Sequence, residues 1–167
     1  MRIEDVNTLE PARFVETFGG LYEHSPWVVE RASGCGPFAD FPHLLAVMTD
    51  IVDSASERER LDLLCAHPEL AGKAAIDKTL TDASTTEQAS AGLDRMTPQE
   101  FETFHRLNAA YREKFGFPFI ICVRLTDKPG ILSAMHSRLE NDRDTEFKTA
   151  LDEVAKIVRI RLEEIIS

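Results

Sequence analysis

The chain has 167 residues, 43% of them hydrophobic, which is enough for one domain with a proper core and too short to expect two. Nineteen Lys and Arg residues against twenty-nine Asp and Glu residues give a formal net charge of -10, which disfavours nucleic acid or an anionic membrane as a partner. A small anionic substrate is compatible with this charge, because a single arginine can bind one carboxylate locally.

The cysteines and the two ends of the chain predict a soluble, intracellular protein. Cys35, Cys65 and Cys122 are odd in number, widely spaced and without a CxxC pair, so neither a disulfide framework nor a cysteine zinc site is indicated. No apolar signal core follows Met1, and no stretch approaches the roughly 18 apolar residues of a transmembrane helix. The end at Ser167 lacks a peroxisomal Ser-Lys-Leu signal, so we expect the protein in the cytoplasm.

Helix start and stop signals recur along the first part of the chain. An apolar helical face at residues 14–18 is followed by Gly19-Gly20, and Ser25-Pro26 has the N-cap and first-turn chemistry of a second helix. Apolar residues recur at helical spacing over residues 44–52. The stretch 56–59 is typical of a capping box, in which two side chains satisfy free backbone donors, and the helix that it opens ends before His67-Pro68.

The second part of the chain is also mainly helical. Capping boxes at residues 84–87 and 97–100 predict helices that begin near residues 85 and 98, the second ending at Gly116. The apolar run 119–125 has strand-like composition but no partner strand, so we expect an extended segment that crosses the core. A turn at residues 128–130, a short helix over 131–138 and a long helix over 145–166 follow. Together these signals predict a single compact all-α domain over residues 1–167, with about eight helices.

The last predicted helix carries an arginine on its apolar face. A rotation of about 100° per residue places Arg161 within the apolar stripe and Arg159 to its side. A guanidinium on a core-facing stripe is costly unless it meets an internal carboxylate, snorkels out at a helix end or lines a ligand pocket. Periodicity alone slightly favours snorkelling, but Arg161 is also the best candidate to bind an anionic or carbonyl-rich ligand.

Five residues on either side of one short loop suggest acid-base chemistry without a metal. His67 lies just past a predicted helix end, where Pro68 steers the backbone and lets the imidazole face a pocket. Ser84 and Glu87 are explained on their own as a helix cap, although a helix N-terminus also offers N–H groups to a bound carbonyl or carboxylate. Gln88 adds an amide to this group.

No motif for a metal or nucleotide cofactor accompanies these residues. Glu102 and His105 have the Glu-x-x-His spacing of helical-bundle metal sites, but the chain has no second copy of it. No glycine-rich phosphate loop occurs. We therefore expect no metal and no cofactor.

The same residues carry a family resemblance. His67-Pro68, Ser84-x-x-Glu87-Gln88, the stretch 24–28 and the stretch 115–120 resemble 2-oxo-4-hydroxy-4-carboxy-5-ureidoimidazoline (OHCU) decarboxylases over essentially the whole chain. The resemblance implies an all-helical, cofactor-independent enzyme, usually a homodimer, that converts OHCU to (S)-allantoin and carbon dioxide in urate breakdown. It also implies His67 as the proton donor and Glu87 as its orienting carboxylate. The implied substrate contacts are Pro68, Ser84, Gln88, Arg161 and backbone groups of Phe119, Ile120, Ile121, Cys122 and Val123.

Three other interpretations stay open at this point. The first keeps the scaffold and changes the substrate to a related ureido or imidazole carboxylic acid. The second is a non-catalytic helical interaction module, in which His67 and Arg161 serve internal hydrogen bonds and the acidic surface engages a basic partner. The third is a metal-binding bundle, which depends only on Glu102 and His105.

Overall fold

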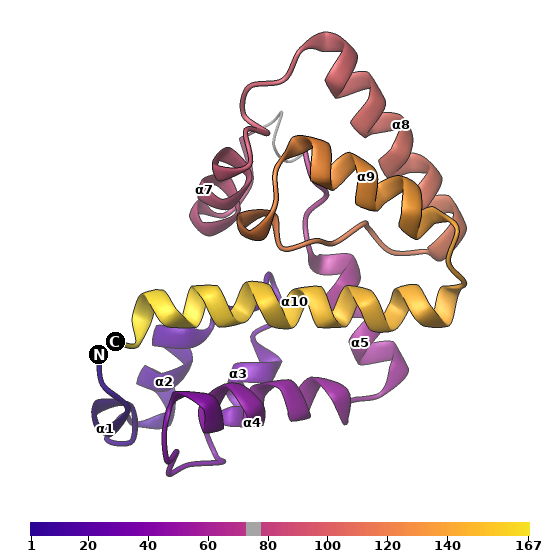
Figure 1. Ribbon diagram of the computed structural model, residues 1–167. Coiled ribbons are helices and arrows are strands. Elements are labelled where there is room, and N and C mark those ends of the chain that lie inside the picture. Colours follow the sequence, from indigo (N-terminus) through magenta and orange to yellow (C-terminus); the bar gives the residue numbers. More distant parts are fainter. Residues whose placement is uncertain (73–77) are drawn as a thin grey trace. The chain divides into compact units, whose positions relative to one another are not determined.

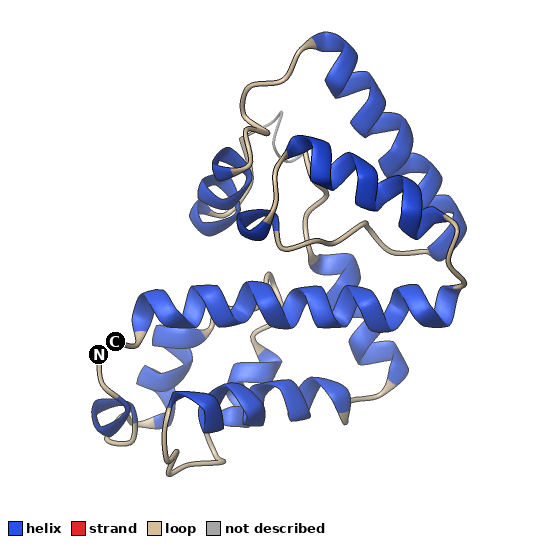
Figure 2. Cartoon of the chain, viewed as in Figure 1, coloured by secondary structure: helices blue, strands red, loops and turns tan. Residues whose placement is uncertain are grey.

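The computed structural model describes residues 1–72 and 78–167. Within these residues the regular secondary structure consists of nine α-helices and one short 3₁₀ helix, η1, so the all-α prediction is confirmed (Figures 1 and 2). The chain divides into two compact units, Met1–Ala66 with Ala155–Ser167, and His67–Val154. The organisation as a single domain over residues 1–167 stays a prediction.

The first unit is built on aromatic and aliphatic side chains from the N-terminal helices. Its elements are α1 (Ile3–Val6), α2 (Pro11–Phe18), α3 (Trp27–Ala32), α4 (Phe41–Asp53), α5 (Glu57–Ala66) and the last turns of α10 (Arg143–Ile165). The Phe14 ring lies 4.8 Å from the Phe18 ring and 5.8 Å from the Phe38 ring, measured between centroids. Such aromatic contacts add to the hydrophobic burial that holds short helices together.

The structure changes one of two predicted helix starts in the first unit and confirms the other. Ser25 does not cap α3, because its hydroxyl donates to the Glu23 carbonyl at 3.2 Å and the helix begins after Pro26 with no side-chain cap. Ser56 does cap α5 and accepts from the Glu59 backbone N–H at 3.1 Å. The α5 helix ends at Ala66, directly before His67-Pro68, as predicted.

The second unit contains α7 (Asp82–Ser90), α8 (Pro98–Phe115), η1 (Val123–Leu125), α9 (Lys128–Leu139) and the first turns of α10. The capping box at Thr97 is confirmed, since Thr97 Oγ1 accepts from the Glu100 N–H at 3.1 Å and the Glu100 carboxylate accepts from the Thr97 N–H at 3.2 Å. Gly116 ends α8 with φ 81°, a left-handed conformation that glycine adopts without steric cost.

The predicted capping box at residues 84–87 is wrong. Helix α7 begins three residues earlier than Ser84-x-x-Glu87 suggests, because Thr81 is its N-cap and accepts from the Ser84 N–H at 3.2 Å. Thr81 has the same capping chemistry as serine, and Asp82 then places a negative charge in the first turn, where the helix dipole favours it. Ser84 and Glu87 therefore lie inside the helix.

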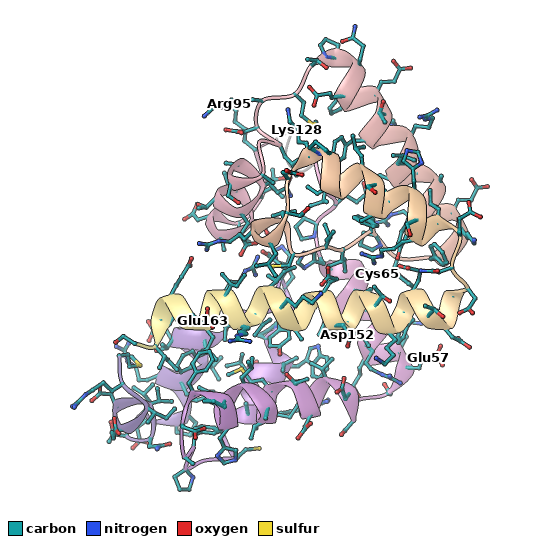
Figure 3. All side chains as sticks on the ribbon, in the orientation of Figure 1. Glu57, Cys65, Arg95, Lys128, Asp152 and Glu163 are labelled. Carbon is teal, nitrogen blue, oxygen red and sulfur yellow. The ribbon has the colours of Figure 1, made fainter. Side chains whose placement is uncertain are left out.

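The predicted turn at residues 128–130 is also helical. Asp127 caps α9 by accepting from the Gly130 N–H at 2.9 Å, and Pro129 fits in the first turn, where its missing N–H costs nothing. Lys128 donates to the Arg95 carbonyl at 3.1 Å and pairs with Glu100 at 3.0 Å, which ties this first turn to the neighbouring loop and to α8 (Figure 3).

The apolar segment after α8 is extended over most of its length. Residues 116–122 run as irregular chain between α8 and η1, with Phe117, Phe119, Ile120 and Cys122 buried (Figure 1). The predicted extended run is corrected at its end, because residues 123–125 form η1 and Leu125 is exposed. Helix α9 packs beside α8, and η1 packs against α7.

Candidate active site

His67 is the first residue beyond α5, and side chains from two other helices hold the backbone that follows it. The Gln88 amide on α7 accepts from the Ala71 N–H at 3.0 Å and donates to the Glu69 carbonyl at 3.3 Å. Asn108 on α8 donates to the Leu70 carbonyl at 2.8 Å. Residues 69–71, which we call the 69–71 segment, are thus fixed by buried amides rather than by secondary structure.

The sequence did not single out Asn108 for this role. A signal was present, because Asn108 lies on the face of α8 that also buries Phe104, Tyr111 and Phe115. A polar residue on such a face needs a hydrogen-bond partner, and the Leu70 carbonyl supplies one. Glu69 in the same segment accepts a hydrogen bond from Arg112 Nε at 2.9 Å.

Helix α7 buries polar side chains where an ordinary helix buries apolar ones. Its buried residues are Ser84, Glu87 and Gln88, which share one face because they are spaced three and four residues apart. Since Thr81 supplies the cap, the capping function no longer accounts for Ser84 and Glu87. Burying three polar side chains costs stability, and such clusters are enriched at functional sites.

The structure brings the 119–123 segment to the same helix. Phe119, Ile120, Cys122 and Val123 are buried and Ile121 is partly buried. Residues 119–121 lie outside helices, so their backbone groups are not used by a helical ladder. Packing of η1 against α7 places the end of this segment beside the helix that carries Glu87 and Gln88.

Arg161 is buried, and the favoured expectation of snorkelling is wrong. Its Nη2 atom lies 2.9 Å from Glu23 Oε1, and Nη1 donates to the Leu21 carbonyl at 3.2 Å. The alternative with an internal carboxylate is therefore the one observed. Arg159, by contrast, is exposed and pairs with Glu163 one turn along α10.

Arg161 belongs to the first unit, whereas His67, Pro68, Ser84, Glu87, Gln88 and the 119–123 segment belong to the second. Glu23 holds the Arg161 guanidinium in a fixed orientation, which suits a residue that must present N–H groups to a ligand. Its role as a substrate contact stays a prediction, and so does contact between His67 and Glu87.

A cavity of about 830 Å³ lies in the second unit. Its wall includes Gln88 and Thr85 from α7 and the start of α8 around Pro98 and Phe101. This volume is within the range of small-molecule pockets. Gln88, which the sequence predicts as a substrate contact, lies in the cavity lining. Gln88 therefore contacts both the 69–71 segment and a cavity.

The described part of the chain contains no group of three or more His, Cys, Asp or Glu side chains placed to hold a metal ion. His105 stacks on Phe101, with ring centroids 6.3 Å apart. In residues 1–72 and 78–167, no helix has both the length and the apolar character needed to cross a membrane.

Comparison with known proteins identifies one family. The family model for OHCU decarboxylase matches residues 7–163. The chain is 45% identical to the 2-oxo-4-hydroxy-4-carboxy-5-ureidoimidazoline decarboxylase of Haloferax volcanii, over 98% of this chain and 95% of the relative. It is 44% identical to the protein of the same name from Halalkalicoccus jeotgali, over 99% of this chain and 92% of the relative.

Solved structures agree with this result. An (S)-allantoin synthase is similar over 100% of this chain, with a TM-score of 0.79 and 34% identity, although the chain covers only 54% of that protein. An OHCU decarboxylase solved in the presence of (S)-allantoin, 24% identical, has the same fold, with a TM-score of 0.69 over 85% of this chain and 92% of that one.

Proposed function

This chain belongs to the OHCU decarboxylase family, and we propose that it converts OHCU to (S)-allantoin and carbon dioxide in urate degradation. The observation that carries this proposal is the polar buried face of α7, with Ser84, Glu87 and Gln88, joined through Gln88 to the backbone that follows His67. A module that only bound a partner has no need of this buried polar face.

The chemistry assigns a role to each residue type. Decarboxylation breaks the bond between the carboxylate carbon and a ring carbon, and the electron pair of that bond stays in the ring system. The site must stabilise this charge and deliver one proton to one face of the ring. His67 donates the proton, and Glu87 orients the imidazole and favours its protonated form. Delivery to one face produces a single enantiomer.

The other predicted contacts hold the substrate. Ser84, Gln88 and Pro68 contact its polar groups, together with backbone groups of Phe119, Ile120, Ile121, Cys122 and Val123. Arg161 binds a carboxylate or carbonyl oxygen, with its guanidinium oriented by Glu23. Support for Arg161 over Arg159 comes from burial, because Arg159 is exposed on the outer face of α10.

The remaining features of the proposal concern the state of the enzyme. We propose a homodimer in the cytoplasm that works without a cofactor. Analytical ultracentrifugation of the purified protein tests the dimer, and a sedimentation coefficient of a monomer at assay concentration contradicts it. Full activity after dialysis against EDTA is expected, and loss of activity restored by one added metal ion would revive the metal-binding interpretation.

The activity is tested by circular dichroism of OHCU generated in situ from urate with purified upstream enzymes. We expect the protein to accelerate the appearance of the (S)-allantoin signal above the spontaneous decay of OHCU. The interaction-module interpretation predicts no acceleration and no thermal stabilisation by (S)-allantoin. A related ureido or imidazole carboxylic acid turned over faster than OHCU would instead support the substrate alternative.

A further inference from the structure

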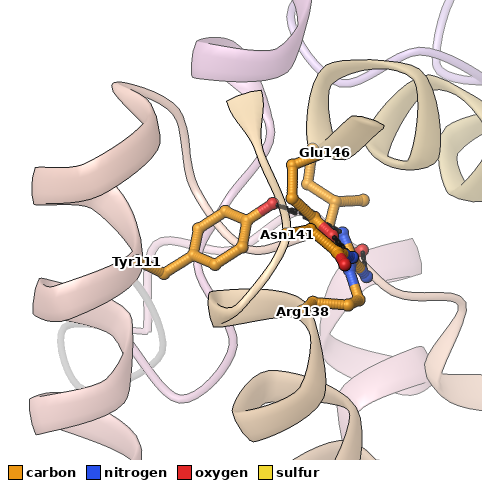
Figure 4. A network of polar contacts seen from close by, with 5 residues as sticks. Tyr111, Arg138, Asn141 and Glu146 are labelled. Carbon is orange, nitrogen blue, oxygen red and sulfur yellow. Dashed lines mark hydrogen bonds and ion pairs between the residues drawn. The ribbon is translucent and has the colours of Figure 1, made fainter. Parts of the chain in front are cut away.

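A buried polar network in the second unit centres on Glu146, which has no role in the site described above (Figure 4). Glu146, fully buried near the start of α10, accepts hydrogen bonds from three side chains on other parts of the unit. Tyr111 Oη on α8 donates at 2.5 Å, Arg138 Nε on α9 at 2.9 Å and Asn141 Nδ2 at 2.9 Å. The carboxylate is thus matched by one cation and two neutral donors.

This network is a weak explanation for stability alone. Desolvation of a buried ion pair cancels much of its attraction, so apolar residues of the same volume often stabilise a fold equally well. Burial and the hydrogen bond to Glu146 raise the pKa of Tyr111, which keeps its hydroxyl a proton donor to the carboxylate. A buried network in which every member is hydrogen-bonded holds its side chains in one fixed arrangement. The other contacts of Arg138 show which part of the chain this arrangement positions.

Another nitrogen of the Arg138 guanidinium contacts the 119–123 segment. Its Nη1 atom donates to the Ile120 carbonyl at 2.7 Å, and its guanidinium carbon lies 4.3 Å from the centre of the Phe119 ring. Tyr111 packs against the same ring, with centroids 5.3 Å apart. Side chains from α8 and α9 thus converge on this segment, and residues 119–121 of it lie outside any helix.

We propose that Arg138, held by Glu146, is a positioning residue that fixes the backbone of the 119–123 segment through the Ile120 carbonyl. This inference rests on the proposed function, in which backbone groups of that segment bind the substrate. The planar guanidinium bonds the carboxylate and the carbonyl simultaneously, and a lysine ammonium cannot reproduce this fork. Arg138 acts through the backbone and needs no contact with the reacting atoms.

The test compares Arg138→Lys with Ile131→Val, a mild core variant on the same helix that leaves the network intact. Both are assayed where each is fully folded by circular dichroism. A purely structural role lowers the active fraction, and thus apparent kcat, while KM stays unchanged. Displaced binding groups instead raise KM, and we expect an increase of about tenfold in Arg138→Lys with weaker (S)-allantoin inhibition. An unchanged KM in Arg138→Lys overturns the proposal.

Hydrogen exchange gives a readout that does not depend on activity. In Arg138→Lys we expect about tenfold faster exchange in peptides covering residues 117–125, with peptides from α7 exchanging as in the wild type. Exchange at the wild-type rate in residues 117–125 overturns the positioning role even if the enzyme is active. If the wild-type protein shows no decarboxylase activity but exchange in residues 117–125 is still faster in Arg138→Lys, the decarboxylase proposal is refuted. The positioning of residues 117–125 by Arg138 is then still supported.

A milder variant covers the case in which Arg138→Lys does not fold. Asn141→Ala removes one donor from Glu146 and leaves Arg138 in place. We expect KM and local exchange to change in the same direction and by a smaller factor. No change of either quantity in a folded Asn141→Ala protein, combined with loss of folding in Arg138→Lys, identifies the network as structural only.

Discussion

Arg161 and Arg159, two arginines of helix α10, each pair with a carboxylate, and the two pairs differ mainly in burial, which yields a quantitative prediction. Arg161 lies 2.9 Å from Glu23, with side-chain exposures of 6% and 2%. Arg159 lies 3.0 Å from Glu163, with exposures of 64% and 49%. The separations are nearly equal, so the different environments decide the energies.

Glu23→Ala should lower the free energy of unfolding by about 3–5 kcal/mol, because the Arg161 guanidinium is left buried without its carboxylate. Glu163→Ala removes an exposed pair and should cost only about 0.3–0.5 kcal/mol. Part of the cost of Glu23→Ala should be recovered when Arg161→Met is combined with it, since the unpaired charge is then absent.

Urea denaturation followed by circular dichroism measures these differences in each single variant and in the double variant. We expect a coupling energy of at least about 2 kcal/mol for the buried pair and a value near zero for the exposed pair. Equal costs for Glu23→Ala and Glu163→Ala, or additive effects of the two changes in the buried pair, would refute the reasoning from burial.

Three further predictions concern α7 and the 69–71 segment. Thr81→Ala should cost about 1 kcal/mol of stability as a lost helix cap, whereas Ser84→Ala should leave stability nearly unchanged and raise KM, as shown by parallel urea melts and kinetics. Asn108→Leu should destabilise the protein by about 1–3 kcal/mol, because the buried Leu70 carbonyl loses its donor, and the same variant should lower kcat/KM. Glu87→Gln should move the basic limb of the pH–kcat/KM profile to lower pH, since a neutral amide no longer favours the protonated imidazole that donates the proton; an unchanged profile contradicts the orienting role.

The sequence predicted those elements whose determinants are local. Thr97 and Glu100 supply both halves of a capping box, and Gly116 supplies the left-handed stop, so α8 was predicted closely at both ends. The same capping motif misled at Ser84 and Glu87, because Thr81 competes for the cap three residues upstream. Motif spacing alone does not rank two caps that are both chemically suitable.

Long-range pairing is what the sequence could not provide. Helical periodicity placed Arg161 on the buried face of α10, but its partner Glu23 lies 138 residues earlier in the chain. The Arg138–Glu146 pair was missed for a similar reason, because Arg138 falls in the last turn of α9, where a cation is ordinary. The sequence did contain one signal of buried polar pairing, namely hydrogen-bonding side chains such as Asn108 and Tyr111 on an otherwise apolar helical face.

In the proposed reaction, His67 donates the proton that completes decarboxylation. The most direct test compares His67→Asn with His136→Asn, an exposed histidine on α9, in the OHCU assay followed by circular dichroism. We expect His67→Asn to retain its fold and to lose roughly 100- to 10,000-fold in kcat/KM, with His136→Asn unchanged. Turnover by folded His67→Asn at the rate of His136→Asn would contradict the assignment.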